Sequence, residues 1–93
     1  MSNKKIRYTE HLLEQIRKRK INIDLIEKIV MEPQQKLPDK DDYRREIRQS
    51  IIEDDASKQK ILRVVTEETE FEIIAVTAYI SSRISKYWSK DEN

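Results

Sequence analysis

The chain has 93 residues, of which 40% are charged and 37% are apolar, and its formal net charge at pH 7 is +1. This balance of 19 basic and 18 acidic residues excludes nucleic-acid binding through a globally basic surface, so such binding would need a local patch. The absence of glycine excludes the glycine-rich loops that cradle phosphates. With no cysteine and a single histidine, His11, we expect no disulfide, no metal and no cofactor.

The length is that of one domain, which we assign to residues 1–93 with a core at about residues 6–88. No apolar run approaches the roughly 20 residues that are needed to span a bilayer. No apolar segment follows the first five residues, so we expect no signal peptide. We therefore expect a cytoplasmic protein without a membrane partner, present as a monomer or a homodimer.

Two consecutive helices are predicted in the first third of the chain. Residues 9–20 begin at Thr9, a good N-cap, and end in the basic residues 17–20, where the helix dipole favours cations. Residues 21–32 have Asn22 as N-cap and end before a proline. Because their connection is very short, the helices should form a hairpin. The basic end is expected to be solvated; its alternative role is a patch that contacts a phosphate backbone.

Strands are predicted in the rest of the chain, at residues 43–53, 58–66 and 71–80. A polar surface loop at residues 33–42 precedes them, and a short helix that starts at Ser81 or Ser82 should end near Trp88. Short links between strands require antiparallel neighbours. The predicted fold class is therefore α+β, with a helical hairpin packed on a three-stranded antiparallel meander and a short C-terminal helix.

The predicted pairing of the first two strands brings arginines together. If their turn spans residues 54–57, Arg48 lies opposite Arg63, and Arg44 shares their sheet face. Tyr79 falls on the opposite, apolar face that the helices should cover. Two arginines that face each other repel. Either neighbouring glutamates or a bound phosphate, which guanidinium groups hold in bidentate fashion, would offset this repulsion.

The C-terminal tail places further cations beside aromatic rings. Arg83 and Tyr87 are four positions apart and share a helix face, with Lys86 next to them. An arginine beside a phenol is suited to bind a phosphate and to stack on a base. The alternative is an amphipathic terminal helix whose cations are solvated and whose tryptophan fills the core.

Several segments together resemble a family of small bacterial proteins, the domain of unknown function 4258. These segments are residues 8–11 (YTEH), 17–21 (RKRKI), 61–65 (ILRVV) and 74–79 (IAVTAY), followed by Arg83 and Tyr87. More distantly, the chain resembles the BrnT-like toxins of the RelE/ParE superfamily. The resemblance implies a RelE-like fold and a toxin of a type II toxin–antitoxin system, a metal-independent endoribonuclease with RNA as substrate and an antitoxin protein as partner. Lys20 departs from the family pattern, which has a glycine there.

RNA cleavage without a metal needs a base, an acid and cations on the phosphate. The matching residues make His11, Arg83 and Tyr87 the predicted catalytic residues, although a lone histidine on a charged helix is often an ordinary surface residue. The predicted substrate-binding residues are Arg44, Arg48, Arg63 and Lys86. One alternative is a non-catalytic RelE-like binding module that docks a protein partner or RNA without cleavage. Another is a self-associating structural protein. The charged outer strand at residues 43–53 argues against open-ended assembly and leaves a C2 dimer open.

Overall fold

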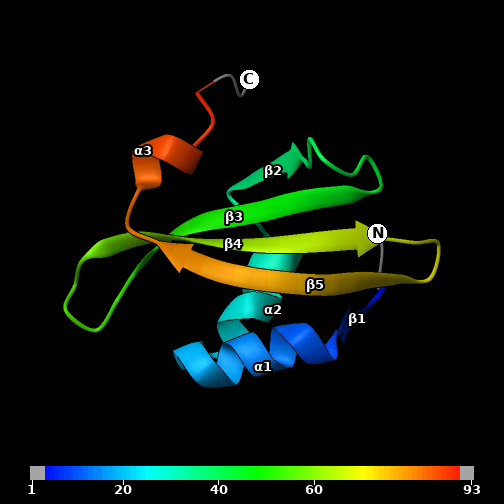
Figure 1. The fold of residues 1–93 in the computed structure, drawn as a ribbon, viewed down its shortest axis with the longest axis horizontal. Helices are drawn as coiled ribbons and strands as arrows, with labels where there is room; N and C mark the ends of the chain where they lie inside the picture. Colours follow the sequence, from blue (N-terminus) through cyan, green and yellow to red (C-terminus); the bar gives the residue numbers. More distant parts are fainter. Residues whose placement is uncertain (1–3, 91–93) are drawn as a thin grey trace.

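The structure is a computed structural model that describes residues 4–90. Its elements in chain order are β1 (Lys5–Tyr8), α1 (Glu10–Arg19), α2 (Ile23–Met31), β2 (Gln35–Pro38), β3 (Arg45–Glu53), β4 (Gln59–Glu68), β5 (Glu72–Ser81) and α3 (Ile84–Tyr87). The strands form one five-stranded sheet in the order β1-β5-β4-β3-β2 (Figure 1). β1 is parallel to β5, and the other neighbouring strands are antiparallel.

The predicted fold class is wrong, because the protein is a mixed five-stranded sheet with three short helices and not a helical hairpin on a three-stranded meander. The predicted helices and the three predicted strands do form within a few residues of their expected ranges. Two edge strands of four residues each, β1 and β2, were missed. A four-residue segment shows too little alternation to be recognised, and the prolines around β2 are typical of a loop.

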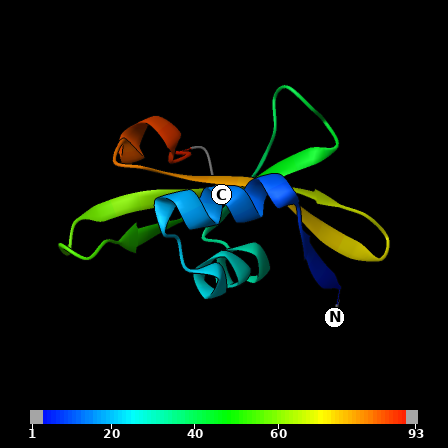
Figure 2. The same ribbon diagram turned by 60° about the horizontal axis from the view of Figure 1, so that its bottom comes forward.

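The two faces of the sheet carry different layers. Figures 1 and 2 show α2 on one face, α3 on the other, and α1 alongside β5. The core lies between α1, α2 and the sheet, and it consists of Leu12, Ile21, Ile26, Ile29, Val30, Leu62, Val64, Ile73, Ala75 and Ala78. Because side chains alternate along a strand, the odd-numbered neighbours in β4 point to the face that carries α3. Arg63 is one of them.

Local interactions begin and end the two longer helices. The Thr9 hydroxyl accepts a hydrogen bond from the Leu12 N–H at 3.1 Å, and the Asn22 side chain accepts one from the Asp24 N–H at 2.8 Å. Both predicted N-caps are therefore confirmed. α1 ends at Lys20, whose φ of 55° and ψ of 43° are left-handed. Lys20 thus occupies the kind of position for which glycine is preferred.

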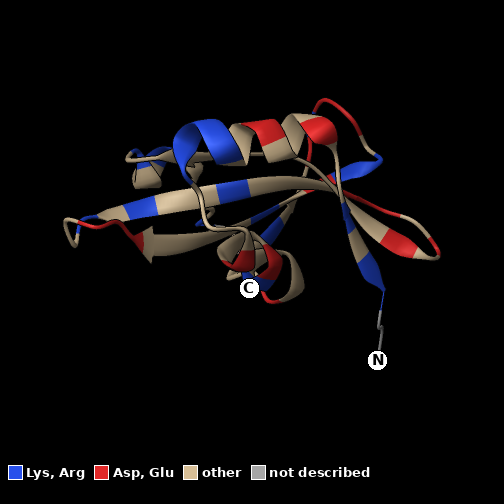
Figure 3. Cartoon of the chain, turned by 90° about the horizontal axis from the view of Figure 1, so that it is seen from below, with Lys and Arg blue, Asp and Glu red and all other residues tan. Residues whose placement is uncertain are grey.

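Charge is distributed unevenly along α1. Its first turn carries Glu10, and its last turn carries Arg17, Lys18 and Arg19. Figure 3 shows this basic end in blue, next to the end of the molecule that carries α3.

Within residues 4–90, no helix combines the length and the apolar character that a membrane crossing requires.

Candidate functional site

The predicted facing pair of Arg48 and Arg63 does not form. Arg63 faces Gln49 across β3 and β4. The connecting loop, residues 54–58, is one residue longer than predicted, and within it Ser57 adopts a positive φ of 60°. A shift of one residue moves a side chain to the other face of a sheet. Arg48 and Arg63 therefore lie on opposite faces.

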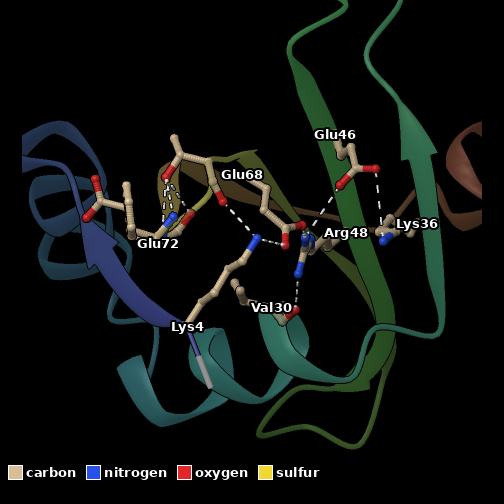
Figure 4. A network of polar contacts seen from close by, with 9 residues as sticks. Lys4, Val30, Lys36, Glu46, Arg48, Glu68 and Glu72 are labelled. Atoms are coloured by element: carbon tan, nitrogen blue, oxygen red, sulfur yellow. Dashed lines mark hydrogen bonds and ion pairs between the residues drawn. The ribbon is translucent and has the colours of Figure 1, made fainter. Parts of the chain in front are cut away.

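Arg48 belongs to a charged network on the face covered by α2, together with Lys4, Lys36, Glu46 and Glu68 (Figure 4). Arg48 is only 5% exposed to solvent. Nη1 donates to the Val30 carbonyl oxygen at 2.6 Å, and Nη2 donates to Glu68 at 3.0 Å and to Glu46 at 3.4 Å. The hydrogen bond from Lys4, together with the charges of Lys4 and Arg48, lowers the pKa of Glu68. The charge of Arg48 is thus balanced inside the fold.

Three other predicted site residues lie away from Arg63. Arg44 is exposed and forms an ion pair with Asp42 at 3.1 Å, and its hydrogen bonds lower the pKa of the Asp42 carboxyl group. His11 is exposed on α1, and Arg83 is exposed just before α3. Neither His11 nor Arg83 lines the pocket that contains Arg63. The predicted catalytic group of His11, Arg83 and Tyr87 is therefore not brought together in this structure.

Arg63 lies on the face covered by α3, where aromatic rings surround it. Its Nε donates to Gln49 Oε1 at 2.7 Å, and its Nη1 donates to the Tyr79 hydroxyl. The guanidinium carbon lies 4.2 Å from the centroid of the Tyr87 ring and 5.6 Å from that of Tyr79. The two rings meet edge to face at 6.1 Å. These contacts fix the plane of the guanidinium group.

Tyr79 was predicted on the opposite face of the sheet, and this prediction is wrong. β5 pairs with β4 so that Tyr79 faces Arg63. The pairing shifts between Val65 and Thr66, where β5 contains one extra residue. A bulge of this kind changes which side chains share a face, and an alternation pattern alone does not reveal it.

Buried amides hold α3 against the sheet and were not predicted as part of the site. Gln49 Nε2 donates to Gln35 Oε1 at 2.8 Å and to the Tyr87 carbonyl oxygen at 2.9 Å. Gln35 Nε2 donates to the Ser89 carbonyl oxygen at 2.7 Å. Both glutamines are buried. The sequence signal was Gln49, which lies two positions from both Ile47 and Ile51 in a predicted strand, where an amide must find a partner once it is buried.

Arg63 has no carboxylate counter-ion among residues 4–90, although it is only 8% exposed. Its hydrogen bonds use Nε and Nη1, and none of them uses Nη2. Buried charges in proteins are normally paired with an opposite charge. Here, neutral acceptors and the faces of aromatic rings surround a full positive charge, which leaves the site attractive to an anion.

A pocket of about 650 Å³ opens above Arg63. Three parts of the chain line this pocket. The sheet contributes Ile47, Arg63, Val65 and Tyr79, and the end of β2 with the following loop contributes Leu37, Pro38, Asp39, Lys40 and Asp41. α3 and the residues after it contribute Lys86, Tyr87, Trp88 and Ser89. Figure 2 shows that the loop after β2 and α3 rise from the same face of the sheet. Two carboxylates and the Lys40 ammonium thus lie on the loop side, and the Lys86 ammonium lies on the α3 side, 5.2 Å from the Tyr87 ring.

The comparisons with known proteins identify no relative. No family model, no curated protein and no solved structure matches the chain. Membership of the domain of unknown function 4258 family therefore stays a prediction. Within the part of the chain that the structure describes, no three histidine, aspartate or glutamate side chains are grouped as a metal site would require. The functional interpretation depends on the geometry around Arg63.

Proposed function

We propose that this chain binds single-stranded RNA in the pocket above Arg63 and does not cut it. This is the non-catalytic alternative that the sequence left open. The observation that carries the proposal is a buried guanidinium group, 8% exposed and without a carboxylate partner in residues 4–90, at the base of an open pocket. A phosphate group would supply the missing negative charge.

The other lining residues are suited to the rest of a nucleotide. Arg63 Nη2 and Lys86 Nζ offer charged donors to phosphate oxygens, and such charge-assisted hydrogen bonds are the stronger kind. Tyr87 and Trp88 offer aromatic surface on which a base can stack. Asp39 and Asp41 offer acceptors for a ribose 2′-hydroxyl, the group that distinguishes RNA from DNA. This combination favours RNA over a free inorganic anion.

Charge removal at the pocket tests the proposal. We expect Arg63→Met to weaken the binding of a fluorescent RNA tetranucleotide by about 10- to 100-fold, because it removes a hydrogen-bonded charge. Arg63→Lys should restore only part of the loss, since lysine lacks the planar fork. Lys86→Ala should also weaken binding. Its matched control is Lys28→Ala, because both lysines are exposed and lie in the last turn of a helix.

Fluorescence anisotropy measures these affinities, and circular dichroism verifies that each variant is folded. A DNA tetranucleotide of the same base order should bind more weakly than the RNA. If the folded Lys86→Ala and Arg63→Lys variants bind RNA as tightly as the wild type, the proposal is wrong. It is also wrong if the wild-type chain has no measurable affinity for the tetranucleotide.

RNA cleavage by a toxin is the second candidate function, and one observation favours it. Asp39 and Asp41 line the same pocket as Arg63, Lys86 and Tyr87. A carboxylate could take the proton from the 2′-hydroxyl, whose oxygen would attack the adjacent phosphorus. The bond to the 5′-oxygen would break, and that oxygen would take a proton from Lys86 or Tyr87. The products would be a 2′,3′-cyclic phosphate and a 5′-hydroxyl.

A cleavage assay separates the two functions. On end-labelled RNA, the binding proposal predicts intact RNA after incubation with the wild-type chain. Cleavage that Asp41→Asn reduces by about 100-fold or more would instead support the toxin. In that case, expression should stop bacterial growth, and an antitoxin protein should reverse the effect. Both functions imply a cytoplasmic location, where RNA is present.

A further inference from the structure

We propose that the RNA strand leaves the pocket on the α3 side and continues onto the exposed basic end of α1. The full ligand is then a strand of several nucleotides. The charges at the two sides of the pocket determine on which side this strand leaves the pocket. This inference depends on the proposed RNA binding and extends it to the length and path of the ligand.

The two sides of the pocket differ in charge. On the loop side, the two carboxylates of Asp39 and Asp41 outnumber the single ammonium group of Lys40. Carboxylates repel the phosphates of a strand that leaves in this direction. Lys86 lies on the α3 side, and the exposed Arg83 directly precedes α3. A phosphate backbone therefore has its more favourable exit past α3.

The basic end of α1 lies on this side of the molecule. Figures 1 and 2 both show the C-terminal end of α1 and α3 at the same end of the sheet, and Figure 3 shows that this end of α1 is basic. α1 packs against β5, and Arg83 lies in the short segment that joins β5 to α3. Lys86, Arg83 and the basic end of α1 thus belong to segments that lie at the same end of the sheet (Figure 1).

The basic end consists of four consecutive exposed residues, Arg17, Lys18, Arg19 and Lys20. None of them forms an ion pair with a carboxylate of residues 4–90. By contrast, Arg7, Arg44 and Arg45 all lie beside acidic partners. The helix dipole offsets only about half of one elementary charge at this end. Most of the positive charge therefore remains available to phosphates.

A length series with salt titration tests this path. Wild-type protein should bind a 12-nucleotide RNA at least about tenfold more tightly than a tetranucleotide in 50 mM salt, because each added phosphate contact releases counterions. The variant Lys18→Glu/Arg19→Glu should lose this gain. Its salt dependence should be shallower by about 0.7 per lost contact, or about 1.4 for two contacts. Lys18→Gln/Arg19→Gln should give a smaller loss in the same direction.

The matched control is Lys5→Glu/Lys28→Glu, which changes the net charge equally on β1 and α2. Lys28 also lies in the last turn of its helix. The control should retain the length dependence. If control and test variants lose equal affinity for the 12-nucleotide RNA, the path is wrong. Equal affinity of the wild type for a poly-glutamate peptide of the same charge would also overturn it.

Tetranucleotide binding separates this inference from the proposed function. The Lys18→Glu/Arg19→Glu variant should bind the tetranucleotide as the charge-matched control does, since a short ligand fills only the pocket. If the wild-type chain binds the tetranucleotide but gains no affinity with the 12-nucleotide RNA, or if the Lys18→Glu/Arg19→Glu variant keeps the full gain, the path alone is rejected. Failure of the wild-type chain to bind either RNA would reject the RNA-binding function and the path together.

Discussion

At the scale of single residues, Lys20 carries the clearest local strain. It ends α1 with a φ of 55°, where a β-carbon costs about 1–2 kcal/mol relative to glycine. We expect Lys20→Gly to raise the free energy of unfolding by about 1 kcal/mol in urea denaturation. Lys18→Gly removes the same charge inside the helix and should lower it by about 1 kcal/mol. Destabilisation by Lys20→Gly as large as that by Lys18→Gly would contradict the assignment.

A single residue also decided how much of the site could be predicted. Arg63, Lys86 and Tyr87 were predicted as site residues, and they do line one pocket. Arg48 was predicted beside them but lies on the opposite face, because the hairpin loop is one residue longer than predicted. The alternation within each strand does not fix the length of the loop that joins them. The register was therefore beyond a prediction from alternation alone.

At the scale of elements, the two longer helices and the three central strands could be predicted because each has its own local pattern. Thr9 and Asn22 are capping residues, and their helices have apolar faces. β1 lacks such a pattern, since its pairing joins Lys5 to Glu72, far along the chain. α3 has no side-chain cap, and hydrogen bonds from buried glutamines hold it instead. Elements formed by long-range contacts were thus missed or only approximately placed.

At the scale of the whole molecule, a net charge of +1 conceals a separation of charge. The hairpin end that joins β4 to β5 carries Glu67, Glu68, Glu70 and Glu72, and the loop after β2 carries Asp39, Asp41 and Asp42, whereas the end of α1 is basic (Figure 3). Such a molecule is attracted to a polyanion in one orientation, even though its overall field is weak. Ionic strength screens this attraction beyond about 8 Å at physiological salt. Direct contacts on the basic side must therefore supply the affinity.

The carboxylates also determine how the stability of the whole fold depends on pH. The pKa values of Asp42, Asp54 and Glu68 are all lowered, by hydrogen bonds from Arg44, from the Lys58 N–H and from Lys4 respectively. A carboxyl group with a lowered pKa stabilises the folded state above its ordinary pKa, and this contribution is lost as the pH falls through the lowered value. We therefore expect the melting temperature to change little from pH 7 to about 5 and to fall below about 4.

Glu68→Gln isolates the contribution of one of these carboxylates, because Glu68 joins Lys4 to Arg48. The variant should melt at a lower temperature than the wild type at pH 7, and the difference should shrink below pH 4, where the wild-type carboxyl group takes up a proton. Glu70→Gln is the control, since Glu70 is exposed and forms no ion pair with residues 4–90. A constant difference across this pH range would show that Glu68 acts through its shape and not through its charge.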